Sequence, residues 1–139
     1  MKSLHYTRDA LVDVLRRHGI NPTHQRTEIA YALFSRGEHL SADRILALVN
    51  GRHSETSKAT VYNTLNLFLG KQLIREVIVD PHKVFYDPNT EPHHHLYNVD
   101  TGELTDIDAS RVEVSGLPQL PHGMVTEGVD IIVRVRSAV

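Results

Sequence analysis

The first half of the chain shows hydrophobic positions at helical spacing in four separate segments. Apolar residues recur three or four positions apart, and each segment begins at a hydroxyl-bearing residue that can cap a helix. A glycine lies at or just beyond the end of each segment, where helices commonly stop. The pattern predicts helices over residues 7–18, 23–35, 41–50 and 57–70, whose apolar stripes form the core of one small helical domain.

After Gly70 the pattern changes from helical to strand-like. Leu73–Asp80 and Lys83–Asp87 are rich in β-branched and aromatic residues, and a turn signal at Asp80-Pro81-His82 joins them, so a hairpin is predicted. Helices followed by a hairpin are typical of a winged helix-turn-helix domain. In that domain the helix before the wing enters the major groove of DNA.

The exposed face of the predicted helix over 57–70 carries hydroxyls, amides and one cation. These groups suit phosphates and base edges, although the same pattern also fits a helix face that is only solvated. The candidate DNA-contacting residues are Arg26, Ser57, Lys58, Thr60, Tyr62 and Asn63, with Thr64 and Asn66 on the same helix and Arg52, Lys71 and Arg75 as further cations for phosphates.

Three consecutive histidines open an alternating run within Glu91–Ile107, and a turn signal follows, which predicts a second hairpin. Side chains alternate faces along a strand, so His93 and His95 share one face while His94 points to the other. A two-residue loop places His95 opposite Asp106, whereas a three-residue loop shifts this pairing by one. Two imidazoles and a carboxylate on one face suit a divalent transition metal; the alternative is a polar, solvated edge strand.

The remaining pattern predicts two domains and an α+β fold. Residues 87–92 hold two prolines and form a predicted hinge between a winged-helix domain over 1–86 and a second domain over 93–139. The second domain has the histidine hairpin, a Pro-rich loop over 116–123 and a final alternating run over 129–136 that predicts a third strand. About 50 residues are too few for an independent core, so we expect this sheet to pair with a second copy as a homodimer.

Composition and charge narrow the choice of partners. Cysteine is absent, so any metal must be held by nitrogen and oxygen ligands. No stretch approaches a transmembrane helix and the N-terminus lacks an apolar signal core, so we expect no membrane partner and a cytoplasmic location. Counting Lys, Arg, Asp and Glu, residues 1–76 carry +4 and residues 77–139 carry −6, which gives the net −2. A basic first half suits a polyanion, and an acidic second half suits cations.

Four segments, in this order and spacing, carry a family resemblance. They are GINPTHQR at 19–26, HLSAD at 39–43, ATVYNTL at 59–65, and His93-His94-His95 followed by Gly102 and Asp106. Over roughly residues 10–110, the chain resembles the ferric uptake regulator family of metal-responsive transcription factors. The resemblance implies a winged-helix DNA-binding domain, a hinge, and an α/β dimerisation domain, with a metal between the two domains.

The resemblance also implies a ligand set and a mode of action. Carried over by position, the regulatory ligands are His39, Asp87, His93, His95 and Asp106, a set that suits Fe(II), Mn(II) or Zn(II). An ion there would favour the one domain arrangement that spaces the recognition helices of a homodimer for a palindromic operator in double-stranded DNA. By position, Tyr62 is the residue expected to reach bases or thymine methyl groups.

The chain departs from the family pattern at two places. Asn98 and Thr101 stand where most members have the first of two cysteine pairs, and a second pair is missing, so the structural zinc site is expected to be absent. A second site near the dimer interface would use His94 and Glu113, with His122 as a further candidate. There Pro92 replaces a usual ligand.

Within the family, the sequence is most similar to the iron response regulator branch. EPHHHLY, DTGEL, the LPQLP loop and the RVR ending carry this likeness. The branch responds to haem and controls iron and haem genes, mostly by repression. Haem can be held by an axial histidine, so His93, His94 and His95 are candidate haem ligands beside the divalent metal.

Three other interpretations use the same residues. His93, His95 and Asp106 could form the facial triad of a non-haem iron enzyme, but the second half offers little material for a substrate pocket, so no enzyme activity is expected. A peroxide detector of the same family would use iron at these ligands to oxidise a nearby histidine. A zinc- or manganese-responsive regulator fits the same ligand set.

Overall fold

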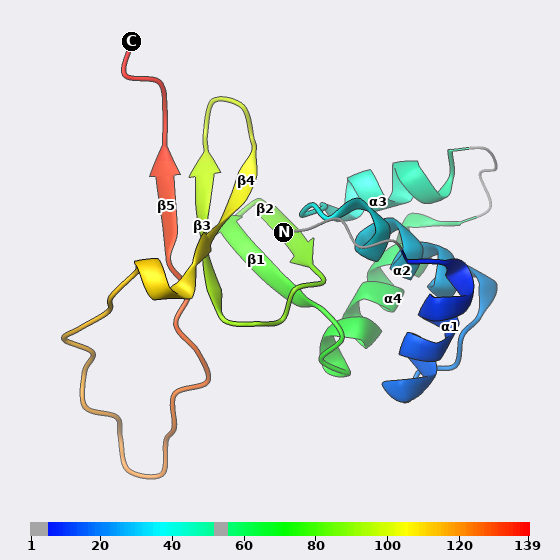
Figure 1. Ribbon diagram of the computed structural model, residues 1–139, viewed down its shortest axis with the longest axis horizontal. Helices are drawn as coiled ribbons and strands as arrows, with labels where there is room; N and C mark the ends of the chain where they lie inside the picture. Colours follow the sequence, from blue (N-terminus) through cyan, green and yellow to red (C-terminus); the bar gives the residue numbers. More distant parts are fainter. Residues whose placement is uncertain (1–5, 52–55) are drawn as a thin grey trace. The chain divides into compact units, whose positions relative to one another are not determined.

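A computed structural model describes residues 6–51 and 56–139. The chain divides into two compact units, Met1–Thr90 and Glu91–Val139 (Figure 1). Helices followed by small sheets make the fold α+β, as the sequence predicts. Two predictions fall outside the described residues: the absence of an apolar signal core at the N-terminus, and the phosphate contact of Arg52.

The first unit contains four helices that begin at the predicted capping residues. They are α1 Arg8–Arg17, α2 His24–Arg36, α3 Ala42–Val49 and α4 Lys58–Gly70. The side chains of Thr7, Thr23, Ser41 and Ser57 each accept a hydrogen bond from a backbone N–H in the first turn. This satisfies N–H groups that have no partner within the helix, so each helix start is set locally.

The helices pack around one apolar core, and the wing follows them. Leu11, Ile29, Leu33, Ile45 and Phe68 are all fully buried in this core. The wing is the antiparallel hairpin of β1 Arg75–Asp80 and β2 Lys83–Asp87. An isolated bridge between Leu40 and Tyr86 ties β2 to the residues just before α3. The predicted winged helix is therefore present.

The second unit is a three-stranded sheet in the order β4-β3-β5. Its strands are β3 His93–Asn98, β4 Leu104–Asp108 and β5 Ile132–Val135. β3 and β4 are antiparallel with His95 opposite Asp106, so the register of the two-residue loop is confirmed. β5 runs parallel to β3 and begins at Ile132, three residues later than the alternating pattern predicts.

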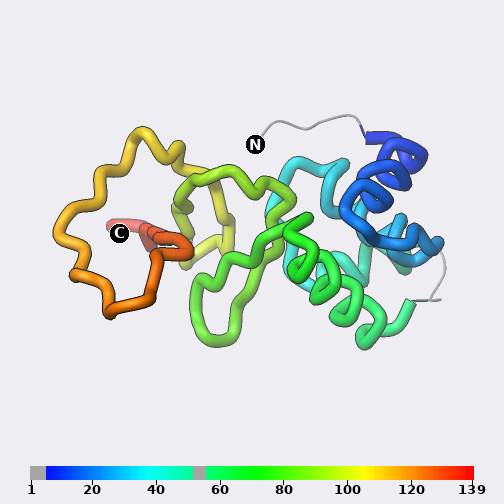
Figure 2. The backbone as a smooth tube through the Cα atoms, turned by 90° about the horizontal axis from the view of Figure 1, so that it is seen from below, coloured from blue at the N-terminus to red at the C-terminus, as the bar shows by residue number. Residues whose placement is uncertain are grey.

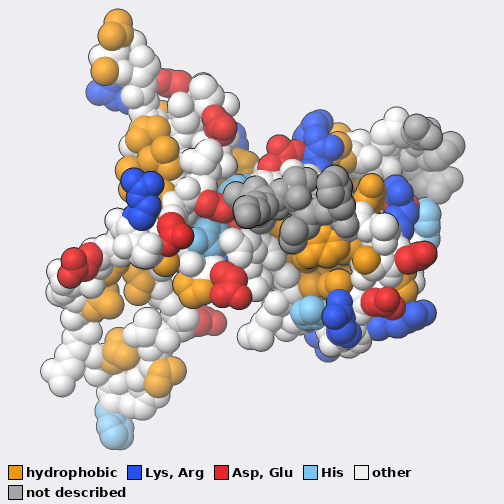
Figure 3. Space-filling view, in the orientation of Figure 1, with side chains coloured by type: hydrophobic (Ala, Val, Ile, Leu, Met, Phe, Trp, Pro, Cys, Tyr) orange, Lys and Arg blue, Asp and Glu red, His pale blue; other side chains and the backbone are white. Residues whose placement is uncertain are grey.

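A long irregular segment joins β4 to β5. After the short 3-10 helix η1 Ala109–Arg111, the chain makes one wide loop (Figure 2). Every side chain over 113–130 is exposed, including Leu117, Leu120, Met124 and Val125. Hydrophobic side chains are visible along this loop in Figure 3. Across the described residues, no helix has the length and apolar character needed to cross a bilayer.

Candidate metal centre

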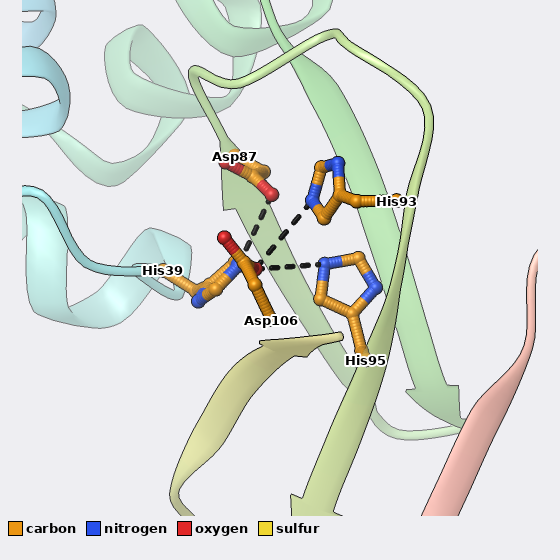
Figure 4. Close-up of side chains that lie close together, drawn as sticks. All are labelled: His39, Asp87, His93, His95 and Asp106. Carbon is orange, nitrogen blue, oxygen red and sulfur yellow. Dashed lines mark ion pairs between the residues drawn. The ribbon is translucent and has the colours of Figure 1, made fainter. Parts of the chain in front are cut away.

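β3 and β4 of the second unit bring two imidazoles and one carboxylate together. The Nε2 atoms of His93 and His95 each lie 3.5 Å from Oδ1 of Asp106 (Figure 4). The two rings meet edge to face with centroids 4.6 Å apart. Both histidine side chains are at least 95% buried, whereas Asp106 keeps 19% exposure. The alternative of a solvated polar strand is therefore wrong for these histidines.

The spacing of these three atoms suits a shared ion. A direct N–H···O hydrogen bond is about 2.9 Å long, shorter than either 3.5 Å separation. Zinc binds nitrogen and oxygen at about 2.0–2.2 Å, which puts neighbouring tetrahedral ligands about 3.4 Å apart. The donor set and its spacing thus fit a divalent transition metal.

A backbone carbonyl orients the ring of His93. Its Nδ1 lies 2.6 Å from the carbonyl oxygen of Glu91, and since a carbonyl can only accept, Nδ1 carries the proton and donates it. In the neutral ring, Nε2 then carries a lone pair, which is directed toward Asp106. A hydrogen bond at the far nitrogen is the usual support of a metal-bound histidine. Sequence analysis missed Glu91, because a backbone carbonyl has no side-chain signal.

His94 lies on the other face of β3 and has a different hydrogen bond. Its Nδ1 accepts the backbone N–H of Ile131 at 3.1 Å, just before β5. A neutral imidazole that accepts at Nδ1 carries its proton on Nε2. While this hydrogen bond holds, neither nitrogen of His94 has a lone pair for an iron or zinc ion.

The first unit holds the other two predicted ligands as a pair. Nε2 of His39 lies 3.1 Å from Oδ2 of Asp87, which is fully buried. Asp87 ends β2, and its other oxygen accepts the N–H of Asn89 at 2.9 Å. The bridge between Leu40 and Tyr86 places the two side chains beside each other. A buried carboxylate is costly without a hydrogen-bonded partner, and the N–H of Asn89 supplies one to Asp87.

Tyr86 of β2 precedes Asp87 in the chain and is itself buried. Burial raises the pKa of its phenol, and the charges of Glu76 and Tyr62 act in the same direction. The phenol therefore stays protonated at neutral pH.

The turn that joins β3 to β4 is closed by hydrogen bonds from side chains. Oδ1 of Asn98 accepts the N–H groups of Asp100 and Thr101, at 2.9 and 3.2 Å. Oγ1 of Thr101 accepts the N–H of Glu103 at 3.2 Å. Asn98 and Thr101, the residues at the positions where the resemblance implies cysteines, thus stabilise the turn directly. Glu113 and His122, the candidates for a second site, are exposed on the long loop.

α4 displays the predicted DNA-contacting side chains. Ser57 caps the helix, Lys58 lies 3.5 Å from Asp43 of α3, and Tyr62 is 40% exposed, with Asn63 also exposed. Thr64 is buried, so the prediction that its side chain lies on the exposed polar face of the helix is wrong. The guanidinium of Arg26 donates to the carbonyl of Asn21 at 3.0 Å, which holds it at the start of α2.

A winged-helix unit followed by a sheet that brings two histidines and a carboxylate together is typical of regulators that bind both DNA and a metal ion. The chain belongs to the ferric uptake regulator family, whose model matches residues 17–133. Members of this family are transcription regulators that bind DNA and form dimers, and they are not enzymes.

Relatives and solved structures agree with this assignment. The peroxide-responsive repressor PerR of Staphylococcus epidermidis is 28% identical over 120 residues, which are 86% of this chain and 80% of that protein. The Helicobacter pylori ferric uptake regulator matches with a TM-score of 0.71 at 18% identity, covering 99% of this chain and 95% of that one. The Pseudomonas aeruginosa regulator solved with manganese matches at 0.66 and 24% identity, covering 92% and 98%. These structures confirm the fold, and the iron response branch stays a prediction.

Proposed function

We propose that this protein is a metal-responsive transcriptional regulator, mostly a repressor, of iron and haem homeostasis genes. The observation that carries the proposal is the buried cluster of His93, His95 and Asp106, with one ring oriented by the Glu91 carbonyl. Its effector is a divalent ion, Fe(II) or Mn(II), with Zn(II) fitting the same ligands. It acts in the cytoplasm as a homodimer on a palindromic operator.

The proposed switch uses ligands from both units. His39 and Asp87 belong to the winged-helix unit, whereas His93, His95 and Asp106 belong to the sheet unit. When bound, the ion supplies the positive charge that holds ligands of both units together. An ion that binds one arrangement of the units better than others shifts the population toward it. That arrangement would set the spacing of the two recognition helices in the dimer, and hence operator binding.

DNA recognition is assigned to α4 and its flanks. Ser57, Lys58 and Thr60 at its start suit phosphates, while Tyr62 and Asn63 suit base edges. Arg26 at the start of α2 supports the phosphate contacts.

The proposed homodimer has its interface on the sheet unit. Among its described residues, apolar side chains such as Leu117, Leu120, Met124 and Val133 are exposed. A second copy would remove this surface from water, and burial of apolar surface drives association.

Haem is proposed as a second effector, in line with the likeness to the iron response regulator branch. His93 is the best placed candidate axial ligand, because its Nε2 is the lone-pair nitrogen, with His95 beside it. His94 would first have to release Ile131. Peroxide sensing through bound iron is the second candidate function, since curated relatives are named peroxide-responsive repressors.

A parallel titration tests the sensor. Apo-protein is titrated with Mn(II) by calorimetry and with haemin by the Soret band, using wild type, the double variant His93→Ala/His95→Ala, and His82→Ala as the control at an exposed histidine. We expect saturable binding by wild type and His82→Ala and its loss in the double variant. The ligand that binds tighter separates metal sensing from haem sensing. Equal binding by all three proteins would contradict the proposed sensor.

Peroxide sensing has its own readout. Iron-loaded protein treated with peroxide would gain one oxygen atom on a histidine, about +16 Da by mass spectrometry, if bound iron drives the oxidation. The double variant serves as the control, because it should not hold the iron.

A further inference from the structure

The side chain of Asn50, which follows α3 as its C-cap, bonds to both backbone groups of Thr56, the residue before the N-cap of α4. Nδ2 of Asn50 donates to the carbonyl oxygen of Thr56 at 2.7 Å, and the N–H of Thr56 donates to Oδ1 of Asn50 at 3.1 Å. Of the residues between them, 52–55 are outside the described range, and this pair of bonds joins the two described ends of the connection. We call it the Asn50 clamp.

Asn50 is itself fixed to α3. It is the C-cap of that helix, and its backbone N–H donates to the carbonyl of Leu46 at 3.0 Å. Thr56 is only 8% exposed, so its backbone groups have little access to water. Leaving such a group without a partner costs about 1–3 kcal/mol. The clamp therefore connects the end of one helix to the start of the next at a defined position.

The clamp requires the chemistry of an asparagine. A planar amide offers a donor and an acceptor side by side, which match the carbonyl and N–H of one residue. An aspartate keeps the acceptor but cannot donate to the carbonyl. An alanine removes both groups.

The clamp lies immediately before the DNA-reading end of α4. Ser57 follows Thr56 and caps α4 with a 3.1 Å bond from the N–H of Thr60, and its hydroxyl lies 2.9 Å from that of Thr60. Farther along, Val61, Leu65 and Phe68 are fully buried and anchor the helix in the core. Loss of the clamp would thus release the first turn of α4 without releasing the helix.

Resting on the proposed DNA-binding function, we propose that Asn50 is a positioning residue for operator recognition. It fixes the first turn of α4, where Lys58 and Thr60 lie, relative to α3. Sequence-specific contacts need this placement, because base edges are read by short directional hydrogen bonds. Non-specific binding depends mainly on charge, which a neutral substitution leaves unchanged.

The test uses the full chain loaded with Mn(II). Wild type first selects a duplex from random DNA, and affinities are then measured for that duplex and for a scrambled one. The variants are Asn50→Ala and Asn50→Asp, and Thr56→Val is the matched control that changes the side chain and keeps the clamped backbone. Amide hydrogen exchange at Thr56 reports the clamp without DNA.

We expect Asn50→Ala to lose the exchange protection of the Thr56 N–H, whereas Asn50→Asp keeps the acceptor of that N–H and therefore keeps most of the protection. Both variants should lose about tenfold of the ratio between selected and scrambled affinity, the effect of one buried hydrogen bond. The negative charge added by Asn50→Asp weakens binding to both duplexes and cancels in the ratio of their affinities. If Asn50→Ala does not fold, Asn50→Asp is the variant that tests the proposal. Thr56→Val should keep the wild-type ratio.

An unchanged ratio in both Asn50 variants, or an equal loss on both duplexes, would overturn the inference. Failure of wild type to select any duplex would instead overturn the proposed function, and with it this role. The two failures are distinguished by whether wild type selects DNA.

Discussion

The two units bury different kinds of side chain. The first unit has a continuous apolar core that includes Leu15, Ile29 and Phe68, all fully buried. In the second unit, the buried described residues are His93, His94, His95, Tyr97 and Leu104. Three of these five are histidines, so hydrogen bonds stabilise the interior of the second unit where apolar burial stabilises the first, and the proposed ion would add to them. An apolar scaffold and the proposed sensor thus have different interiors.

The largest expected effect comes from the apolar core of the first unit. Phe68→Ala should lower the free energy of unfolding by about 3–5 kcal/mol, because it removes buried surface and leaves a cavity. Chemical denaturation measures this loss. Glu127→Ala, at an exposed charged position of the second unit outside the proposed interface, is the control and should change stability by less than about 0.5 kcal/mol. Similar losses in both variants would contradict the comparison.

The next effect tests whether an ion stabilises the second unit. Mn(II) at a hundredfold excess over its Kd should add about 2.7 kcal/mol to the free energy of unfolding, since it binds the folded state. Asp106→Asn should abolish most of this gain, as followed by thermal denaturation.

Asp108→Asn is the matched control on the same strand. The amide and hydroxyl of Ser110 lower the pKa of the exposed Asp108 by hydrogen bonding to its carboxylate, and the oxygen of an asparagine can still accept from them. Asp108→Asn should therefore keep the Mn(II) effect. A full Mn(II) effect in Asp106→Asn would show that Asp106 is not a ligand.

The smallest effect separates the structural role of His94 from that of a ligand. His94→Gln should remove the acceptor at the Nδ1 position and cost about 1–3 kcal/mol for the N–H of Ile131. His94→Asn places an oxygen near the Nδ1 position and should lose less. Amide hydrogen exchange at Ile131 measures the difference. Equal protection in both variants would mean that the hydrogen bond contributes nothing to the docking of β5.

The sequence by itself determined the local features of this protein. Helical spacing and hydroxyl caps set the four helices, and alternation with a turn signal set the hairpin of β3 and β4. The sequence left two registers open for this hairpin, and the structure has the one that places His95 opposite Asp106. These patterns are readable because they depend on neighbours a few residues away. The family ligands were named from the resemblance, and the spacing of His93, His95 and Asp106 follows from that register.

Tertiary structure decided that Nδ1 of His94 is an acceptor. His93 donates to the carbonyl of Glu91, two residues away, whereas His94 accepts from Ile131, 37 residues away, so the two adjacent histidines take opposite tautomers. Side-chain identity does not encode these bonds, because backbone groups are the same at every position. The Asn50 clamp was not predicted for the same reason, because its partners are backbone groups. The start of β5 at Ile132 has a different cause, since a parallel strand is positioned by its partner and not by its own alternation.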